Sequence, residues 1–128
     1  MSVEYIVVPY KIPSRPEDPV TYYPRLQAVG EINIREIAKE ISSISTVSSV
    51  DTIAVLEGLL EIIPKHISNG EIVKLGELGS FFLTIKAEGS LTPEEVSPQK
   101  IKSNKLHFRP GKLIKKALNE VKYHKRKR

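Results

Sequence analysis

The residues best suited to chemistry in this chain are the cationic side chains gathered near its C-terminus. Residues 109–128 hold nine Lys or Arg and a single acid, Glu120, for a net charge of +8; because the whole chain carries +5, residues 1–108 carry −3. Such an uneven distribution predicts a polyanionic partner, with nucleic acid ahead of an anionic membrane surface. For residues 125–128 alone, a solubilising tail is an equally good interpretation.

Patterns typical of catalysis or metal binding are weak in comparison. The chain has three histidines, His66, His107 and His124. They are far apart in the sequence and do not have the spacing of a metal site. The chain has no cysteine, which excludes disulfides, thiol catalysis and Cys-ligated zinc. The adjacent Glu94 and Glu95 have no reason to differ in environment, as an acid–base pair requires. We therefore expect no enzyme activity, no metal, no cofactor and no small-molecule substrate.

The length and composition indicate one domain with an appendage. The chain has 128 residues, of which 40% are hydrophobic, as in an ordinary globular protein. It has no apolar run of the roughly 18 residues that a membrane span needs and no secretory signal pattern at its start. We expect a cytoplasmic protein without a membrane partner.

Two helices are predicted in the first half of the main domain. Asn33 is a good N-cap for the first, and the serine-rich residues 42–46 end it by offering the backbone competing hydrogen bonds. Ser48 caps the second, which runs to about Ile67 and carries two apolar stripes. Because the first helix can cover only part of so wide a face, a second copy of the chain is the simplest further partner.

The stretch from Gly70 to Ile85 then predicts a glycine-bounded β-hairpin, and it is the element around which the rest is placed. A polar excursion over residues 87–103 follows, in which Pro93 can start one helical turn. A strand is expected at 104–109, and Pro110 is expected to begin the last helix.

Residues 1–30 predict a second, separate hairpin. Two β-rich runs flank a loop with three prolines, and Pro24 marks the second run as an edge strand or a bulge. The hairpin is expected to pair with itself or with the edge of the main sheet. Its tyrosines, Tyr5, Tyr22 and Tyr23, are interpreted first as an aromatic core, with a stacking surface as the alternative.

Two motifs stand in order along the chain: GEIVKLGELGSF at residues 70–81, in the hairpin, and FRPGK at residues 108–112, at the entry into the last helix. Together they resemble the hairpin with its following Phe and the last-helix entry of the HU/IHF family of histone-like bacterial DNA-binding proteins. The N-terminal extension resembles that of the longer HU-related proteins. The resemblance implies an α+β fold: an intertwined dimer with two N-terminal helices, a three-stranded antiparallel sheet and a C-terminal helix, plus an N-terminal β-hairpin extension. The expected domains are the extension at 1–30, the HU-like domain at 31–123 and a disordered basic tail at 124–128.

The resemblance also implies which residues meet DNA. They are expected to be Lys86, Pro98, Lys100, Lys102, Lys105, Arg109, Lys112, Lys115 and Lys116. Arg109 and Lys112 combine positive side chains with the amides at a helix start. The family's arms are rich in Arg and end in an Asn-Pro turn that wedges into the minor groove. Here the matching region has three glutamates and no Arg, and Pro98 after Ser97 is the nearest counterpart of the wedge.

The function that follows is sequence-nonspecific, architectural DNA binding by a homodimer that contacts the phosphate backbone and minor groove of double-stranded DNA. The expected role is DNA condensation in the bacterial nucleoid. The alternative is an HU-fold module for protein–protein interaction with weak or lost DNA binding, motivated by the acidic arm and the added hairpin.

Overall fold

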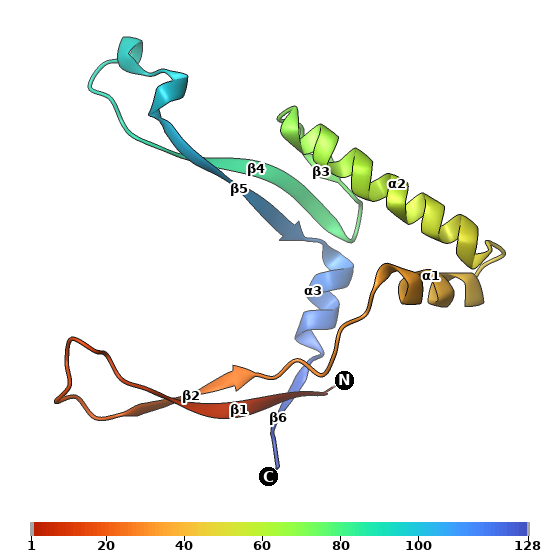
Figure 1. Ribbon diagram of the computed structural model, residues 1–128, viewed down its shortest axis with the longest axis horizontal. Helices are drawn as coiled ribbons and strands as arrows, with labels where there is room; N and C mark the ends of the chain where they lie inside the picture. The colour runs from red at the N-terminus through yellow and green to blue at the C-terminus, as the bar shows by residue number, and fades with distance from the viewer. Residues whose placement is uncertain (1, 128) are drawn as a thin grey trace. The chain divides into compact units, whose positions relative to one another are not determined.

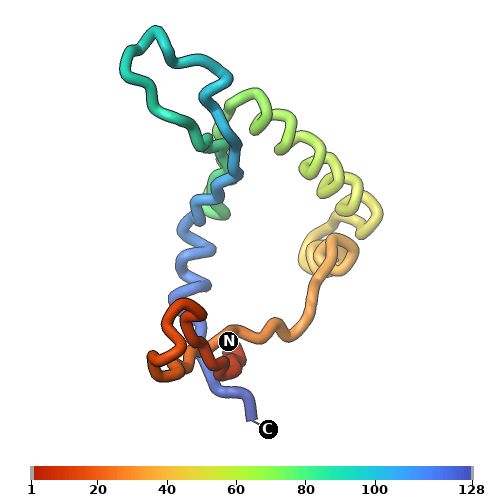
Figure 2. Tube along the Cα trace, turned by 60° about the vertical axis from the view of Figure 1, so that its left-hand side comes forward, coloured from red at the N-terminus to blue at the C-terminus, as the bar shows by residue number. Residues whose placement is uncertain are grey.

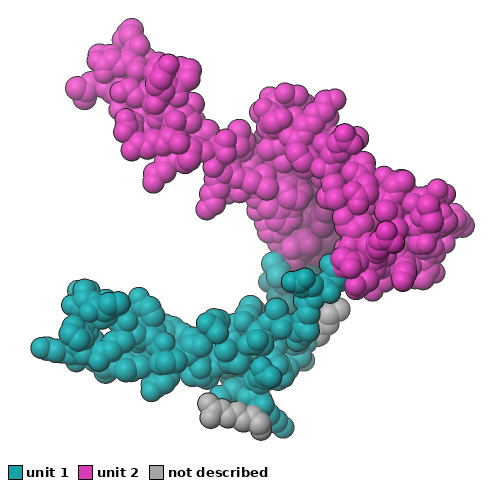
Figure 3. All heavy atoms as spheres, viewed as in Figure 1, with its two compact units in different colours: residues 1–32, 117–128 teal, residues 33–116 magenta. Residues whose placement is uncertain are grey.

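The computed structural model describes residues 2–127 and divides into two compact units (Figure 3). One unit spans residues 33–116 and contains the helices α1 (Ile34–Ser43) and α2 (Ser49–Ser68) and the strands β3 (Val73–Lys74), β4 (Gly79–Ala87) and β5 (Ile101–Pro110). It also contains residues 112–116 of the helix α3 (Lys112–Asn119). The other joins the N-terminal residues through Ile32 to the chain from Ala117 onward. The domain boundaries at 30 and 123 stay a prediction from the sequence.

Helices α1 (Ile34–Ser43) and α2 (Ser49–Ser68) begin at the predicted caps. The Asn33 side chain accepts a hydrogen bond from the Glu36 amide at 3.0 Å, and the Ser48 side chain accepts one from the Asp51 amide at 3.1 Å. These bonds satisfy amides that have no partner within the helix. At the end of α1, the Ser45 hydroxyl donates to the Ile41 carbonyl at 2.7 Å. The predicted helix break at the serine run is confirmed.

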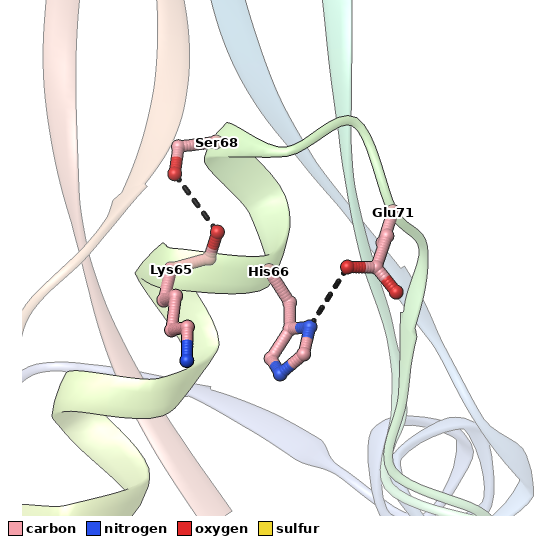
Figure 4. A network of polar contacts seen from close by, with 4 residues as sticks. All are labelled: Lys65, His66, Ser68 and Glu71. Atoms are coloured by element: carbon pink, nitrogen blue, oxygen red, sulfur yellow. Dashed lines mark hydrogen bonds and ion pairs between the residues drawn. The ribbon is translucent and has the colours of Figure 1, made fainter.

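Polar contacts fix the C-terminal end of α2 to the chain that follows it (Figure 4). A ring nitrogen of His66 lies 2.9 Å from a carboxylate oxygen of Glu71, and the Ser68 hydroxyl donates to the Lys65 carbonyl at 2.8 Å. Gly70, between Ser68 and Glu71 in the sequence, has a φ of 82°, a conformation that glycine adopts without steric cost. The chain therefore turns sharply from α2 into the sheet.

The sheet of this unit is antiparallel in the order β3–β4–β5, with β3 at Val73–Lys74, β4 at Gly79–Ala87 and β5 at Ile101–Pro110. Phe81 lies opposite Phe108, and Leu83 lies opposite Leu106. These four side chains lie on one face of the sheet. That face and α2 line an apolar groove, to which α2 contributes Leu60 and Ile63. The predicted three-stranded antiparallel sheet is confirmed.

The ribbon of β4 and β5 runs on into an irregular tip, which both Figure 1 and Figure 2 show at its far end. The Glu88 amide donates to the Lys100 carbonyl at 2.9 Å and closes the tip. Within it lie two short 3-10 turns, η1 (Pro93–Glu95) and η2 (Pro98–Lys100). The predicted turn at Pro93 is confirmed, but β5 begins three residues before the expected strand.

The last helix also differs from its prediction. Pro110 is the final residue of β5, where it pairs with Gly79, and α3 begins only at Lys112. The prediction that Pro110 starts the helix is wrong because the β4–β5 ladder extends through this proline.

The second unit is a sheet in the order β2–β1–β6. Strand β1 (Ser2–Tyr10) pairs antiparallel with β2 (Thr21–Leu26), which is an edge strand as Pro24 indicated. On its other side β1 pairs in parallel with β6 (Lys122–Lys125). The expected disordered tail at 124–128 is therefore wrong for His124 and Lys125, which lie in this strand. Arg128, at the end of that tail, lies outside the described residues.

Side chains of the second unit support this unexpected pairing. His124 lies opposite Glu4 in the register, and its ring contacts the Glu4 carboxylate at 3.5 Å and the Ser2 hydroxyl. Among residues 2–127, no helix is both long enough and apolar enough to cross a membrane.

Candidate nucleic-acid interface

The face of the β4–β5 ribbon that points away from α2 is cationic. Because successive side chains of a strand alternate between faces, Lys86 from β4 lies on the same face as Lys105 and Arg109 from β5. The remaining members of this outer face are Ser80, Phe82, Thr84, Ser103 and His107. The two strands, both described in full, place no acidic residue on it. Three of the predicted contact residues thus lie together on a surface that has only positive charges.

Arg109 does not stand alone on this face. Its guanidinium carbon lies 5.3 Å from the ring centroid of Phe82, and the Phe82 ring stacks on the His107 ring at 5.5 Å with an interplanar angle of 18°. A guanidinium at this distance is attracted to the aromatic ring and loses rotameric freedom. The stack therefore holds the Arg109 charge close to the sheet, next to the start of α3.

Two glycines fix the junction between β5 and α3. A Cβ on Gly111 would lie 2.2 Å from the Glu77 carbonyl oxygen, and one on Gly79 would lie 2.5 Å from the Arg109 carbonyl oxygen. Both distances are too short for any other residue, and Gly79 also has a φ of 147°. The close crossing of the β3–β4 turn over this junction sets the direction in which Arg109 and Lys112 leave the backbone.

The start of α3 offers less to an anion than its sequence suggests. The Gly111 amide already donates to the Leu78 carbonyl at 2.9 Å, and the Leu113 amide donates to the Glu77 carbonyl at 3.1 Å. These bonds anchor the helix to the turn but occupy two amides that the sequence left for a phosphate. The cationic character here comes mainly from exposed side chains of α3, which are Lys112, Lys115 and Lys116.

The predicted residues nearer the tip are in a different environment. The Lys102 ammonium lies 3.0 Å from a Glu88 carboxylate oxygen, so part of its charge is already balanced within the chain. The register between β4 and β5 shifts next to this contact, between Lys86 and Ala87. Lys100 and Pro98 lie in η2, next to the bond that closes the tip.

The middle of the tip is acidic and also exposes two apolar side chains, Leu91 and Val96. Glu94 and Glu95 are exposed, and Leu91 is 98% exposed. Pro98, the nearest counterpart of the family's wedge, instead lies in η2, which ends at the bond that closes the tip.

Phe82 and His107 are parts of this surface that the sequence analysis did not include among the contact residues. Because side chains alternate along a strand, Phe82 lies on the face of Lys86, and His107 lies on the face of Lys105. What was lacking was the register between the strands, which puts Phe82 opposite His107. Once that pairing is given, the stack under Arg109 follows.

Comparisons with solved structures identify the fold. The model matches a candidate bacterial DNA-binding protein from Bacteroides vulgatus ATCC 8482 with a TM-score of 0.66 and 14% identity over 97% of this chain. It spans 47% of that chain, about half its length. HU in an HU–DNA cocrystal from Anabaena matches with a TM-score of 0.54 and 23% identity, over 70% of this chain and 99% of the other. At these identities the likeness shows the fold alone.

The sequence comparison identifies the family. No curated protein matches the chain. The family model described as an HU domain fused to wHTH, Ig, or glycine-rich motif matches residues 1–125, which is nearly the whole chain. The resemblance inferred from the hairpin and FRPGK motifs is confirmed, and the chain belongs to this family of HU-domain proteins.

Proposed function

We propose that the chain is an architectural protein that binds duplex DNA through its phosphate backbone, without sequence preference, as a homodimer. The observation that carries the proposal is the acid-free outer face of the β4–β5 ribbon, continued by the lysines of α3. That HU-domain family members and the Anabaena HU–DNA cocrystal have the same fold adds to this argument.

The proposed contact surface has six cations in each protomer. They are Lys86, Lys105, Arg109, Lys112, Lys115 and Lys116. Among residues 2–127, none of the six takes part in an ion pair, so each is free to displace counterions from a phosphate. Contacts of this kind position a protein on the duplex but do not read its sequence. We therefore expect strong salt dependence and weak discrimination between sequences.

The tip is proposed to make a smaller contribution. Pro98, Lys100 and Lys102 are the residues that would approach the minor groove. Glu94 and Glu95 oppose entry of the apex because they repel phosphate. We infer that bending by a wedged proline is weak in this protein and that most of the binding free energy comes from the outer face and α3.

The exposed surface of the chain supports a dimer. The chain exposes 11303 Å², whereas a folded protein of 14.4 kDa exposes about 6,800 Å² and two separate proteins of the sizes of the two units about 8,200 Å². Ala38 is the one hydrophobic residue of the described chain that is fully buried. A chain with so small a core of its own needs a partner to cover its apolar surface.

The second apolar stripe of α2 shows where that partner is expected to pack. Val55 is 69% exposed, and Leu59 and Ile62 on the same stripe are 39% and 54% exposed. An intertwined dimer in which the α2 helices pack together would cover this stripe. Residues 31–123 are proposed as the HU-like domain, residues 1–30 as an extension that β6 completes, and the bacterial nucleoid in the cytoplasm as the site of action.

Fluorescence anisotropy with labelled duplexes of several unrelated sequences tests this function. We expect similar affinities for all sequences and a loss of about 10³- to 10⁵-fold between 50 and 200 mM salt if six to ten phosphates are contacted. No binding at 50 mM salt would refute the proposal and favour the alternative of an HU-fold protein–protein interaction module.

A further inference from the structure

The sheet β2–β1–β6 has an aromatic face that the duplex-binding proposal does not use. In the register, Tyr5 lies opposite Leu26 on β2 and Lys125 on β6, Pro9 lies opposite Tyr22, and Val3 lies opposite Tyr123. Since residues paired across strands share a face, as do alternate residues of one strand, this face has one tyrosine from each strand. They are Tyr22, Tyr5 and Tyr123.

Two of these tyrosines are exposed, and the third, Tyr5, is half-buried in the unit to which all three belong. Tyr22 is 66% exposed and Tyr123 is 63% exposed. Together with Tyr5 they line an open groove of about 760 Å³, whose remaining lining residues are Val7, Tyr23, Pro24 and Leu26. The groove is thus open and mainly apolar, with an aromatic ring from each of the three strands.

Positive charge borders this groove. A second groove of about 1000 Å³ shares Val7 and Tyr22 with the first and is lined by Lys125, Arg126 and Lys127. The Arg126 amide donates to the Tyr5 carbonyl at 2.9 Å, so the basic segment is held along β1 beside the aromatic face.

We propose that this face is a second nucleic-acid site, which takes unpaired bases of single-stranded nucleic acid. Tyr5, Tyr22 and Tyr123 stack on successive bases, while Lys125, Arg126 and Lys127 neutralise the phosphates between them. Aromatic rings on neighbouring strands beside a basic groove are the combination that single-strand binding requires, because every base has a π-face and every linkage has a charge. Paired bases inside a duplex cannot reach such a surface.

Charge argues against a second copy of the chain as the occupant. Two copies joined face to face about a two-fold axis would each bring a Lys125–Arg126–Lys127 segment to the shared interface, where like charges repel. Strand addition at the β2 edge is also disfavoured, because Pro24 has no amide to donate. A polyanion with flat apolar groups can stack those groups on the tyrosine rings and place its negative charges beside the basic segment.

The test uses the full-length chain and a labelled 12-nucleotide oligothymidylate, with a labelled duplex measured in parallel. The double variant Tyr22→Ala/Tyr123→Ala removes two stacking rings that are exposed, so the fold is little disturbed. Tyr10→Ala is the matched control, because Tyr10 is 54% exposed but lies on the opposite face, edge-on to Tyr23. Tyr22→Phe/Tyr123→Phe retains the rings without their hydroxyls.

We expect each ring removed to weaken oligothymidylate binding by roughly 5- to 150-fold, the range for stacking of one base on an aromatic side chain. Duplex affinity should stay within about two-fold of wild type, since the outer face of the β4–β5 ribbon is intact. The Phe variant and Tyr10→Ala should both bind oligothymidylate like wild type. An equal loss in Tyr10→Ala, or no loss in the double Ala variant, would overturn the proposal.

Photocrosslinking of the wild-type chain to an oligonucleotide with 5-iodouracil gives a readout that does not depend on how the variants fold. Crosslinks should map to peptides containing Tyr5, Tyr22 or Tyr123. Crosslinks confined to β4, β5 and α3 would overturn the second site while leaving duplex binding intact. A double Ala variant that changes oligomeric mass but not oligothymidylate affinity would instead assign the face to contacts between copies. Binding of oligothymidylate without binding of duplex would refute only the proposed function.

Discussion

Removal of two charges from the outer face of the β4–β5 ribbon should change how DNA affinity responds to salt. The double variant Lys86→Gln/Lys105→Gln replaces two ammonium groups that share this face with neutral side chains of similar length. Both side chains are exposed, and glutamine keeps most of their aliphatic length, so the strands should retain their pairing. The change therefore isolates electrostatic contact with phosphate.

The expected magnitude follows from counterion release. Each neutralised phosphate adds about −0.9 to the slope of log affinity against log salt concentration. Because the double variant removes two cations from each of two protomers, the slope should become less steep by about 3.6. Over the four-fold change from 50 to 200 mM salt, this difference corresponds to a roughly 150-fold smaller loss of affinity than wild type shows.

The assay is a series of anisotropy titrations of a labelled duplex at salt concentrations from 50 to 200 mM. The matched control is Lys39→Gln/Lys65→Gln, which removes the same charge from exposed positions of α1 and α2. Because exposed charges away from the contact are largely screened at these salt concentrations, the control should keep the wild-type slope. A wild-type slope in Lys86→Gln/Lys105→Gln, or an equal change in the control, would refute the assignment of the outer face as the contact surface.

Three further changes test other parts of the account. Gly111→Ala puts a Cβ 2.2 Å from the Glu77 carbonyl oxygen and should destabilise the protein by about 1–3 kcal/mol, seen as a lower melting temperature; Gly89→Ala, with open space at that position, should have little effect. Val55→Asp places a charge on the exposed stripe of α2 and should lower both the dimer fraction in sedimentation and the melting temperature, whereas the control Glu57→Asp should not; a folded, dimeric Val55→Asp would contradict the proposed interface. Glu88→Gln frees Lys102 from its ion pair and should make the salt slope steeper by up to about 1.8 in the dimer; an unchanged slope would exclude Lys102 from the contact.

Much of the main unit could be predicted because its signals are local. Asn33 and Ser48 cap α1 and α2 in the structure as their sequence positions suggested, and Gly70, Gly76 and Gly79 all have the positive φ that a glycine-bounded turn requires. Caps and turns depend on residues within three or four positions, so a single sequence contains the information.

The features that were missed depend on pairing between distant residues. Strand β6 has only four residues and little apolar character, and it forms because β1, more than a hundred residues earlier, offers it an edge. The same holds for Pro110, which continues β5 because Gly79 lies opposite. Neither pairing leaves a local pattern, so the tail was assigned to disorder and α3 was started two residues early.

The candidate site shows the same division. Strand alternation alone is enough to place Lys105 and Arg109 on one face, but the ion pair of Lys102 with Glu88 and the register shift beside it leave no pattern in the sequence. The bonds that occupy the Gly111 and Leu113 amides likewise come from the β3–β4 turn, more than thirty residues away.

Sedimentation equilibrium of the protein with a short duplex tests the central claim most directly, since the claim is that two chains together present one cationic surface to DNA. The absence of tryptophan allows the duplex to be followed at 260 nm with little contribution from protein. The account predicts a free protein of twice the 14.4 kDa chain mass at micromolar concentration and an even number of chains on each duplex. A 14.4 kDa species that binds the duplex as single chains would contradict it.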